Sequence, residues 1–420
     1  MLTIYNLIYN IFFVPVIYIL GLFSKKIRAG KKEKFGNYGF KFLNRTIWIH
    51  AVSVGEVMLA STLIDKMGDF KYDIVLTTST PQGQELAKNK LKDKCKMITY
   101  FPYDTKYAIN RAIDAINPEM AIIIETEIWP NFAKRMKELA IPLFIVNGRI
   151  SERTYKSYKK LSFFFKEVLK NYAGILAQSE DDAKRFIDIG ADKNRVAVSG
   201  NIKFDLKTPE EYIKHKYRLL FKTFNKNVLV FASTHGEENS GLIDTYKDLK
   251  NSVADLKLII APRHLEKVPQ IEKILDSKLL KWGKRSSNAS FDDNDVIILD
   301  TTGELGSVYS AADVCVICGS FNNTGGHNPL EATVWGKPAI TGPNIKNFRQ
   351  IYKSLCELNC AFKVKNYTQL KEKIFELFSD RNYMEKVKSG CICAMEKNRG
   401  ATNFTIKYLK EFNGEKYERD

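Results

Sequence analysis

The fold is decided by one stretch near the start of the chain, Ile47-Trp48-Ile49-His50-Ala51-Val52-Ser53-Val54-Gly55-Glu56-Val57. An apolar, β-branched run ends at a glycine, and apolar residues then recur at helical spacing, which predicts a strand, a tight turn and a helix. Glu56 therefore lies in the first helical turn, at the carboxyl end of a strand. Because this edge of an open α/β sheet binds ligands, Glu56 is a candidate for chemistry. The local alternative is that an acidic residue there complements the helix dipole.

The same strand and helix alternation continues along the chain. Strand-like apolar runs follow at residues 73–78, 97–101, 121–125, 143–146, 174–177 and 196–198, and again at 228–232, 258–260, 296–299, 314–317 and 338–340. Apolar strands alternating with helices predict parallel sheets covered on both faces. The sequence thus predicts an α/β protein with two doubly wound, Rossmann-like domains and a hinge near residues 200–210. The expected domains are residues 25–205 and 206–420, after a membrane anchor at 1–24.

Composition limits the partners. The 65 Lys and Arg residues against 48 Asp and Glu give a formal net charge of +17, which favours an anionic membrane surface, a phosphorylated substrate or nucleic acid. A general lysine richness is the plainer alternative. The seven irregularly spaced cysteines suit a reducing compartment and do not form a disulfide framework. Cys315 and Cys318 have C-x-x-C spacing within an apolar run, where core packing is favoured over a metal or redox site.

The amino terminus predicts membrane association. Residues 2–23 are almost entirely apolar, and six basic residues follow, namely Lys25, Lys26, Arg28, Lys31, Lys32 and Lys34. About 20 apolar residues suffice to cross a bilayer, and the basic cluster places the following domains on the cytoplasmic side. A helix lying in the membrane interface fits equally well, and a buried helix of a soluble fold is the third possibility.

Loops of the second domain are suited to a phosphorylated ligand. Arg263 follows a strand, where a guanidinium can bind phosphate in bidentate fashion. A Gly-rich loop at residues 319–326 leads to Asn328 as N-cap and Pro329 as first helical residue, and such a helix start attracts anions. Glu331 could close a capping box or accept hydrogen bonds from ribose hydroxyls. Together these features suggest a nucleotide-sugar donor.

Six motifs resemble those of the 3-deoxy-D-manno-octulosonic acid (Kdo) transferases of lipopolysaccharide synthesis. They are His50-Ala51-Val52-Ser53-Val54-Gly55-Glu56, Thr78-Ser79-Thr80-Pro81-Gln82-Gly83, Glu125-Thr126-Glu127-Ile128-Trp129-Pro130-Asn131, Asn147-Gly148-Arg149-Ile150-Ser151, Gly200-Asn201-Ile202-Lys203-Phe204-Asp205 and Asn328-Pro329-Leu330-Glu331. The resemblance runs in order from the apolar segment to about residue 350. It implies a GT-B glycosyltransferase with CMP-Kdo as donor and a lipid A precursor as acceptor, at the cytoplasmic face of the inner membrane.

The resemblance also implies roles for particular residues. Inverting transfer to a hydroxyl needs an ionised general base, and Glu56 fits this role. By resemblance, Glu125 or Glu127 assists the transition state together with Lys203, although Glu127 could instead cap a helix start. Donor binding falls to Pro262, Arg263, Gly303, Glu304, Leu305, Asn328, Pro329, Leu330 and Glu331. Arg263 and the backbone at Asn328 would hold the CMP phosphate, and Gly303, Glu304, Leu305 and Glu331 would contact cytidine or ribose.

We expect no metal or other cofactor. The leaving group carries a single phosphate, which Arg, Lys and a helix dipole can neutralise. The acidic run Asp292-Asp293-Asn294-Asp295 resembles a divalent-cation site, but it lies in a polar loop, and a solvated turn is favoured.

Rival functions are another GT-B enzyme, such as a lipid-directed UDP-sugar transferase or a UDP-sugar epimerase, and a membrane-anchored basic binding module without catalysis. Dispersed basic residues without interleaved aromatics argue against a nucleic-acid partner. The sequence leaves open how many Kdo units are added and in which oligomeric state the protein works.

Overall fold

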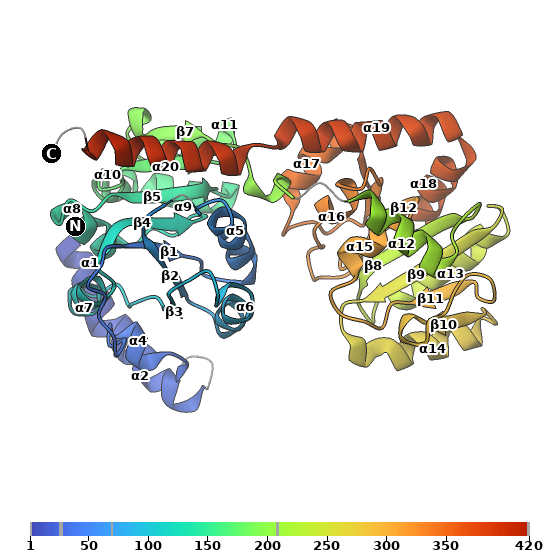
Figure 1. Cartoon of the computed structure of the whole chain (residues 1–420), viewed down its shortest axis with the longest axis horizontal. Coiled ribbons are helices and arrows are strands. Elements are labelled where there is room, and N and C mark those ends of the chain that lie inside the picture. Colours follow the sequence, from blue (N-terminus) through green and yellow to red (C-terminus); the bar gives the residue numbers. More distant parts are fainter. Residues whose placement is uncertain (1, 25–27, 69, 207–209, 418–420) are drawn as a thin grey trace. The chain divides into compact units, whose positions relative to one another are not determined.

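The computed structural model describes residues 2–24, 28–68, 70–206 and 210–417. The chain divides into two compact units, the first formed by Met1–Asp205 with Arg399–Asp420 and the second by Leu206–Asn398. Each unit contains a seven-stranded parallel sheet with helices on both faces (Figure 1). The two doubly wound domains predicted from the sequence are therefore present. The last helix departs from the expected division, because it belongs to unit 1 although it follows unit 2 in the chain.

The sheet of unit 1 has the strand order β3-β2-β1-β4-β5-β6-β7. Its strands are β1 (Thr46–His50), β2 (Asp73–Thr78), β3 (Met97–Tyr100), β4 (Pro118–Ile124), β5 (Leu143–Gly148), β6 (Gly174–Ala177) and β7 (Val196–Val198). All seven coincide with apolar runs predicted as strands. The order reverses direction between β1 and β4, which are neighbours in the sheet but not in the chain.

The helices of unit 1 cover both faces of this sheet. They are α1 (Leu2–Ile8), α2 (Val14–Phe23), α4 (Lys31–Lys34), α5 (Val54–Ile64), α6 (Pro81–Leu91), α7 (Lys106–Ile116), α8 (Pro130–Glu138), α9 (Glu152–Lys160), α10 (Ser162–Leu169), α11 (Glu180–Asp188) and α20 (Ala401–Tyr417).

Side chains alternate between the two faces of the unit 1 sheet and form two cores. Trp48 and Ile123 belong to one hydrophobic cluster, whereas Ile47, Ile49 and Ile122 belong to the other. Since both faces are buried, almost every position of β1 and β4 must be apolar. This requirement explains why the runs appear as continuous apolar stretches in the sequence.

The sheet of unit 2 has the order β10-β11-β9-β8-β12-β13-β14. Its strands are β8 (Asn227–Thr234), β9 (Leu256–Pro262), β10 (Trp282–Lys284), β11 (Val296–Ile298), β12 (Val314–Ile317), β13 (Ala339–Thr341) and β14 (Ala361–Lys363). The sequence predicted five of them and missed β10 and β14. Both are three-residue edge strands that end in a lysine, with the sequences WGK and AFK, so they produce no apolar run, unlike the equally short β7 with the sequence VAV. Here the order reverses between β8 and β12.

The helices of unit 2 again flank its sheet. They are α12 (Glu211–Phe221), α13 (Asn239–Lys250), α14 (Val268–Ser277), α15 (Leu305–Val308), α16 (Leu330–Thr333), α17 (Arg349–Glu357), α18 (Tyr367–Ser379) and α19 (Arg381–Asn398).

Helix α20 is fastened to unit 1 at its start and along its length. Asp205 accepts hydrogen bonds from the backbone N–H groups of Gly400 and Thr402, at 2.7 and 2.5 Å. Further along, the ring of Phe412 lies 5.1 Å from that of Phe144 on β5. The Asp205 carboxylate thus satisfies free N–H groups at the helix start, as an N-capping residue does.

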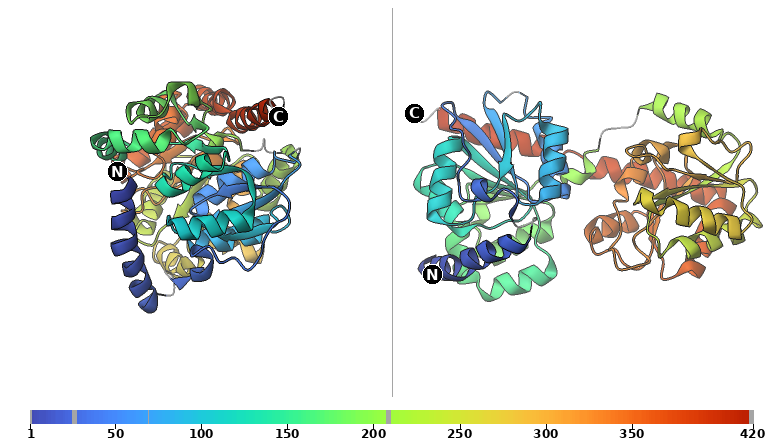
Figure 2. Two further views of the ribbon diagram at one scale, coloured as in Figure 1. Left: turned by 90° about the vertical axis from the view of Figure 1, so that its left-hand side faces the viewer. Right: turned by 90° about the horizontal axis from the view of Figure 1, so that it is seen from below.

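The N-terminal helices lie against unit 1, where α1, a π-helical segment (Tyr9–Phe13) and α2 form one continuous rod (dark blue, Figure 2). The Tyr5 hydroxyl donates to Asp104 Oδ2 at 2.8 Å, and the Asp104 N–H donates to the Tyr9 hydroxyl oxygen at 3.1 Å. Burial raises the pKa of Asp104 to about 6. The rod is therefore joined to the loop after β3 by polar contacts as well as by packing of Tyr9.

Candidate active site

The predicted catalytic residues of unit 1 gather where its strand order reverses. Glu56 follows β1, and Glu125 and Glu127 follow β4, the adjacent strand. Parallel strands present their carboxyl ends at one edge, and the reversal leaves a crevice there that binds ligands in such sheets. The prediction that placed Glu56 at this edge is confirmed.

Glu56 takes part in the capping of helix α5, and the pKa of its carboxyl is also raised. It lies in the first turn of α5, and its Oε2 accepts a hydrogen bond from the Ser53 N–H at 3.0 Å, as one half of a capping box. Burial raises the pKa of Glu56 to about 7, and the charges of Glu125 and Glu127 add to this effect. A carboxyl with this pKa is half ionised at neutral pH, which suits a group that takes up a proton during a reaction.

Glu125 and Lys203 form an ion pair in the same site. The Lys203 Nζ lies 2.9 Å from Glu125 Oε1, and both side chains are only about one-fifth exposed. Glu125 has a left-handed backbone with φ of 60°. Such a conformation costs a residue with a side chain roughly 1–3 kcal/mol and is commonest at functional sites. Two residues far apart in the sequence but predicted to act together are thus in direct contact.

Glu127 lies in the same loop as Glu125, without the lysine partner. Burial raises the pKa of its carboxyl. Helix α8 begins at Pro130 after Trp129, so Glu127 is not the N-cap residue that the local alternative suggested.

Hydrogen bonds position the turn that carries Lys203. Two of the residues that make them, Asn147 and Asn201, belong to the sequence motifs, but the sequence did not predict these bonds. Asn147, with φ of 58°, accepts the Ile202 N–H on its Oδ1 at 3.0 Å. Asn201 accepts the Lys203 N–H at 3.0 Å and donates to Gln178 Oε1 at 3.0 Å. These bonds hold the short 3-10 turn at Ile202–Phe204 against the ends of β5 and β6.

Unit 2 has a corresponding site where its strand order reverses between β8 and β12. Glu238, buried at 1% exposure just before α13, accepts four backbone N–H groups. The donors, at 2.8 to 3.2 Å, are His235, Gly319, Ser320 and Phe321. This carboxylate therefore fixes the start of the Gly-rich loop. The sequence interpretation missed Glu238, although it follows a strand and a glycine at the start of a helix, as Glu56 does.

Two histidines meet beside the Gly-rich loop. The Nε2 atoms of His235 and His327 are 3.0 Å apart, and their rings are stacked at 9°. Burial, with the nearby His235 and Arg263, lowers the pKa of His327 to about 4. Gly319 has φ of 68°, and a Cβ there would lie 2.9 Å from the His327 ring. Glycine is thus required by both backbone and space.

Of the residues predicted to bind phosphate and ribose, Arg263 and Glu331 interact electrostatically. Arg263 is exposed at the end of β9, just after Pro262, and its backbone N–H donates to Thr234 at 2.9 Å. Burial raises the pKa of Glu331, and the charge of Arg263 and a hydrogen bond from Asn328 act against this rise. Arg263 and Glu331 therefore share one electrostatic environment.

The helix start after the loop differs by one residue from the prediction. Helix α16 begins at Leu330 with Pro329 as its N-cap, so Asn328 is not the N-cap and Pro329 is not the first helical residue. Asn328 still serves the helix start, because its Oδ1 accepts the Leu330 N–H at 3.1 Å. The Leu330 side chain is fully buried, which restricts it to a packing role.

The remaining predicted donor residues form a second group. Gly303 has φ of 81° with open space around it, and Leu305 begins α15. Glu304 accepts hydrogen bonds from Tyr217 and Arg285, each at 3.1 Å. Although burial acts to raise it, the pKa of Glu304 is lowered by these partners and Thr301. Glu304 is thus held by protein groups on one side of an open glycine turn.

Aspartates of the acidic run at residues 292–295 form ion pairs with lysines. Asp292 pairs with Lys222 and Lys226, and Asp295 lies 2.6 Å from Lys250 and 3.0 Å from Lys257. Among the described residues, no group of three or more His, Cys, Asp or Glu side chains is arranged to hold a metal. The side chains of Cys315 and Cys318 are fully buried in and after β12, as core packing predicts.

Comparison with known proteins agrees with the motifs. A family model described as 3-deoxy-D-manno-octulosonic-acid transferase matches residues 29–206. The 3-deoxy-D-manno-octulosonic acid transferase of Haemophilus influenzae is 31% identical over 402 residues, which are 94% of this chain and 94% of that protein. The chain belongs to the Kdo transferase family. A bifunctional glycosyltransferase/methyltransferase of Fusobacterium nucleatum is 35% identical over 351 residues, or 82% of this chain, but the match covers only 54% of that protein.

Solved structures show the same fold. UDP-GlcNAc 2-epimerase from Neisseria meningitidis, bound to UDP-GlcNAc, superimposes with a TM-score of 0.61 at 15% identity, over 87% of this chain and 100% of that one. This likeness concerns the fold alone, which is GT-B as predicted. Membership of the Kdo transferase family makes the protein a glycosyltransferase, so the alternative of a binding module without catalysis is wrong.

The sequence predicted a membrane anchor at residues 1–24. Within the described residues, no helix combines the length and the apolar character needed to span a bilayer. The described apolar segment consists of α1, the π-helical turn at Tyr9–Phe13 and α2, which has 10 residues.

Proposed function

We propose that this enzyme transfers Kdo from CMP-Kdo to a hydroxyl of a lipid A precursor with inversion at the anomeric carbon. The acceptor oxygen forms the new bond to that carbon while the bond to the CMP phosphate breaks. The hydroxyl proton passes to Glu56, and CMP leaves as the anion. The observation that carries this proposal is the half-buried Glu56, with its pKa raised to about 7 beside the Glu125–Lys203 pair.

Lys203 and Glu125 stabilise the transition state in this scheme. Negative charge develops on the departing phosphate, and a preorganised ammonium group is suited to receive it. The Glu125 carboxylate holds Lys203 in position through the 2.9 Å ion pair, and its own charge keeps the base pKa high. Glu127, which adds to the same field, has a supporting role.

Unit 2 provides the donor site in this proposal. Arg263 binds the phosphate together with Pro262 and the free backbone beyond Asn328, and Glu331 receives hydrogen bonds from ribose hydroxyls. Gly303, Glu304 and Leu305 contact the cytosine end of the donor. The Gly-rich loop fixed by Glu238 would shape this site. No metal or cofactor takes part, because Arg and Lys side chains neutralise a single phosphate.

The enzyme acts at an anionic membrane surface in this proposal, on the cytoplasmic face of the inner membrane. Large apolar side chains on the N-terminal rod are about half exposed, namely Ile4, Leu7, Ile8, Ile11, Val16, Ile19 and Leu20. A helix with one docked face and one exposed apolar face is suited to the membrane interface. The positive net charge of +17 adds attraction to anionic lipid, which salt weakens.

Mass analysis of the products from CMP-Kdo and a lipid A precursor tests the reaction. Wild type should add at least one Kdo unit, and Glu56→Gln should add none while still binding CMP, because the amide cannot accept the proton. Glu138→Gln on α8, whose side chain is 46% exposed, is the matched control and should remain active. Near-normal turnover by Glu56→Gln would remove Glu56 as the base, and transfer from a UDP-sugar in place of CMP-Kdo would favour the rival donor.

A further inference from the structure

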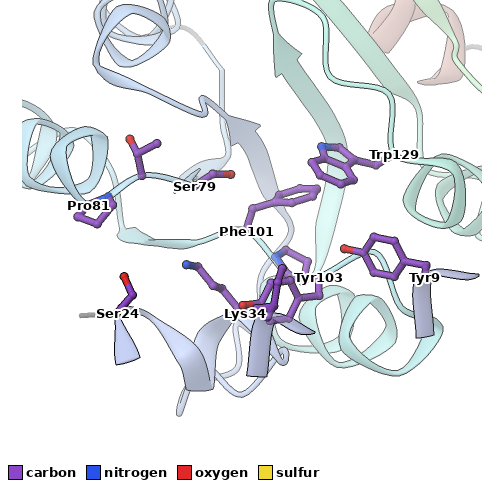
Figure 3. A pocket seen from close by; sticks show the side chains of 11 residues that line it. Tyr9, Ser24, Lys34, Ser79, Pro81, Phe101, Tyr103 and Trp129 are labelled. Atoms are coloured by element: carbon purple, nitrogen blue, oxygen red, sulfur yellow. The ribbon is translucent and has the colours of Figure 1, made fainter. Parts of the chain in front are cut away.

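A cavity of about 540 Å³ lies in unit 1 between the N-terminal rod and the carboxyl edge of the sheet. Figure 3 shows Tyr9, Phe101, Tyr103 and Trp129 around this hollow, with Lys34 at its side. Ile17 of α2 also lines it. Most of these side chains are aromatic or aliphatic, and the cavity has the size of a typical ligand pocket. The group that fills it is therefore apolar over most of its surface.

The cavity adjoins the turn that carries Glu56. Ser79 and Thr80, which line it, donate their backbone N–H groups to the Val52 carbonyl, each at 3.1 Å. The Phe101 ring stacks on His50, the last residue of β1, at 4.0 Å between centroids. A ligand in the cavity thus lies one layer of side chains away from the Ser53–Glu56 turn.

Lys34 adds a positive charge to the apolar walls. Its Nζ lies 4.9 Å from the centre of the Tyr100 ring, and burial lowers the pKa of the ammonium group. A cation removed from water in this way gains from an anionic partner. The occupant therefore combines an apolar body with a negative group.

The N-terminal rod indicates where such a ligand comes from. The helices that contribute Tyr9 and Ile17 to the cavity expose Ile11, Val16 and Ile19 on their outer face, each at least 50% accessible. A lipid can pass from a membrane along this apolar face into the cavity without its chain crossing water.

We infer that this cavity binds one acyl chain of the acceptor lipid, with Lys34 bound to an anionic group of the same molecule. The inference rests on the proposed function and assigns the acceptor's chain a site in unit 1. Chain binding there would position the lipid head group beside Glu56.

Binding of monoacylglycerol phosphates of increasing chain length tests the site without transfer. In wild type the affinity should rise about fourfold for each methylene that enters the cavity. Bromine near the chain end should quench Trp129 fluorescence, and Trp129→Phe should lose that part of the quenching. Lys34→Met should weaken binding of the phosphate probe at least tenfold and leave a neutral monoacylglycerol unaffected.

A pair of matched substitutions on α2 separates the cavity from the membrane surface. Ile17→Phe fills the cavity, so its affinity should stop rising at shorter chains, whereas Ile19→Phe on the exposed face should behave as wild type. Identical length dependence in both variants, or quenching that persists in Trp129→Phe, overturns the inference. Kdo transfer that does not depend on the length of the acceptor's acyl chains overturns the assignment of a chain to the cavity and leaves the proposed function intact. Chain binding as described without any transfer from CMP-Kdo overturns the proposed function alone.

Discussion

Transfer should depend on pH through the Glu56 carboxyl, whose pKa is raised to about 7 by burial and by Glu125 and Glu127. Only the ionised carboxylate can accept the proton of the acceptor hydroxyl. At about pH 6, Glu56 is then ionised in about 9% of the enzyme molecules. The value of kcat/KM should therefore lie about tenfold below its plateau at high pH. Each further pH unit downward should cost about another factor of ten. An ordinary glutamate would show no such loss in this range.

Glu125→Gln is the perturbation that tests the electrostatic reason. It removes the like charge that has the larger effect on the Glu56 pKa, and it leaves the Lys203 ammonium without its carboxylate partner. Both changes favour ionised Glu56, so the half-maximal pH of kcat/KM should fall. Because Glu56 remains buried in this variant, the half-maximal pH should stay above 4.5, the ordinary pKa of a glutamate. The plateau itself should also fall, since Lys203 loses its anchor.

The assay is the pH profile of kcat/KM under acceptor-limited conditions, which reports the pKa of the free enzyme. Glu138→Gln, which changes an exposed surface carboxylate on α8, should keep the wild-type profile. A wild-type profile that is flat between about pH 6 and 8 would contradict Glu56 as the titrating base. An unchanged half-maximal pH in Glu125→Gln would show that Glu125 does not act on it.

Four further predictions concern stability, positioning and metal dependence. The pKa of Glu56 is higher in the folded protein than its ordinary value, so ionisation of this carboxyl destabilises the fold as pH rises from about 4.5 to 7. Above this window Glu56→Gln should have a free energy of unfolding roughly 1–3 kcal/mol larger than wild type, and below it the two should be equal. Denaturant unfolding measures this difference. Glu238→Gln leaves at least one buried N–H without an acceptor, so it should lower stability by roughly 3 kcal/mol and weaken CMP binding measured by calorimetry. Asn147→Ala frees the Ile202 N–H and should lower kcat more than it raises KM, because the turn bearing Lys203 loosens. Activity should persist in excess chelator.

Most of the fold could be predicted because parallel strands are buried on both faces. The seven strands of unit 1 and the five central strands of unit 2 each require a continuous apolar run, and such runs are visible in a single sequence. The edge strands β10 and β14 each have only three residues, of which the last is a lysine, so no apolar run marks them. The return of α20 to unit 1 depends on contacts with Asp205, which lies 195 residues before Gly400, and with Phe144, which lies still earlier in the chain.

The site could be predicted only as far as local sequence determines it. The strand, glycine and helix around Glu56 place it at a sheet edge, and Arg263 follows a strand end for the same reason. The Glu125–Lys203 pair joins positions 78 apart, and it was expected from family resemblance, not from any local pattern. The one-residue shift at Asn328 shows that the start of a four-residue helix is not fixed by its capping residues alone.

Glu56 and Glu238 lie in similar sequence patterns, but their carboxylates have different surroundings. Each glutamate follows a strand and a glycine and stands in or before the first turn of a helix. Glu238 is 1% exposed and accepts four backbone N–H groups, so its carboxylate is fully used in holding the Gly-rich loop. Glu56 is only partly buried, accepts the Ser53 N–H and lies in the field of two other carboxylates, which keeps its proton exchangeable near neutral pH. The hydrogen bonds that each carboxylate accepts therefore separate a glutamate that holds a loop from one that could serve as the proposed base.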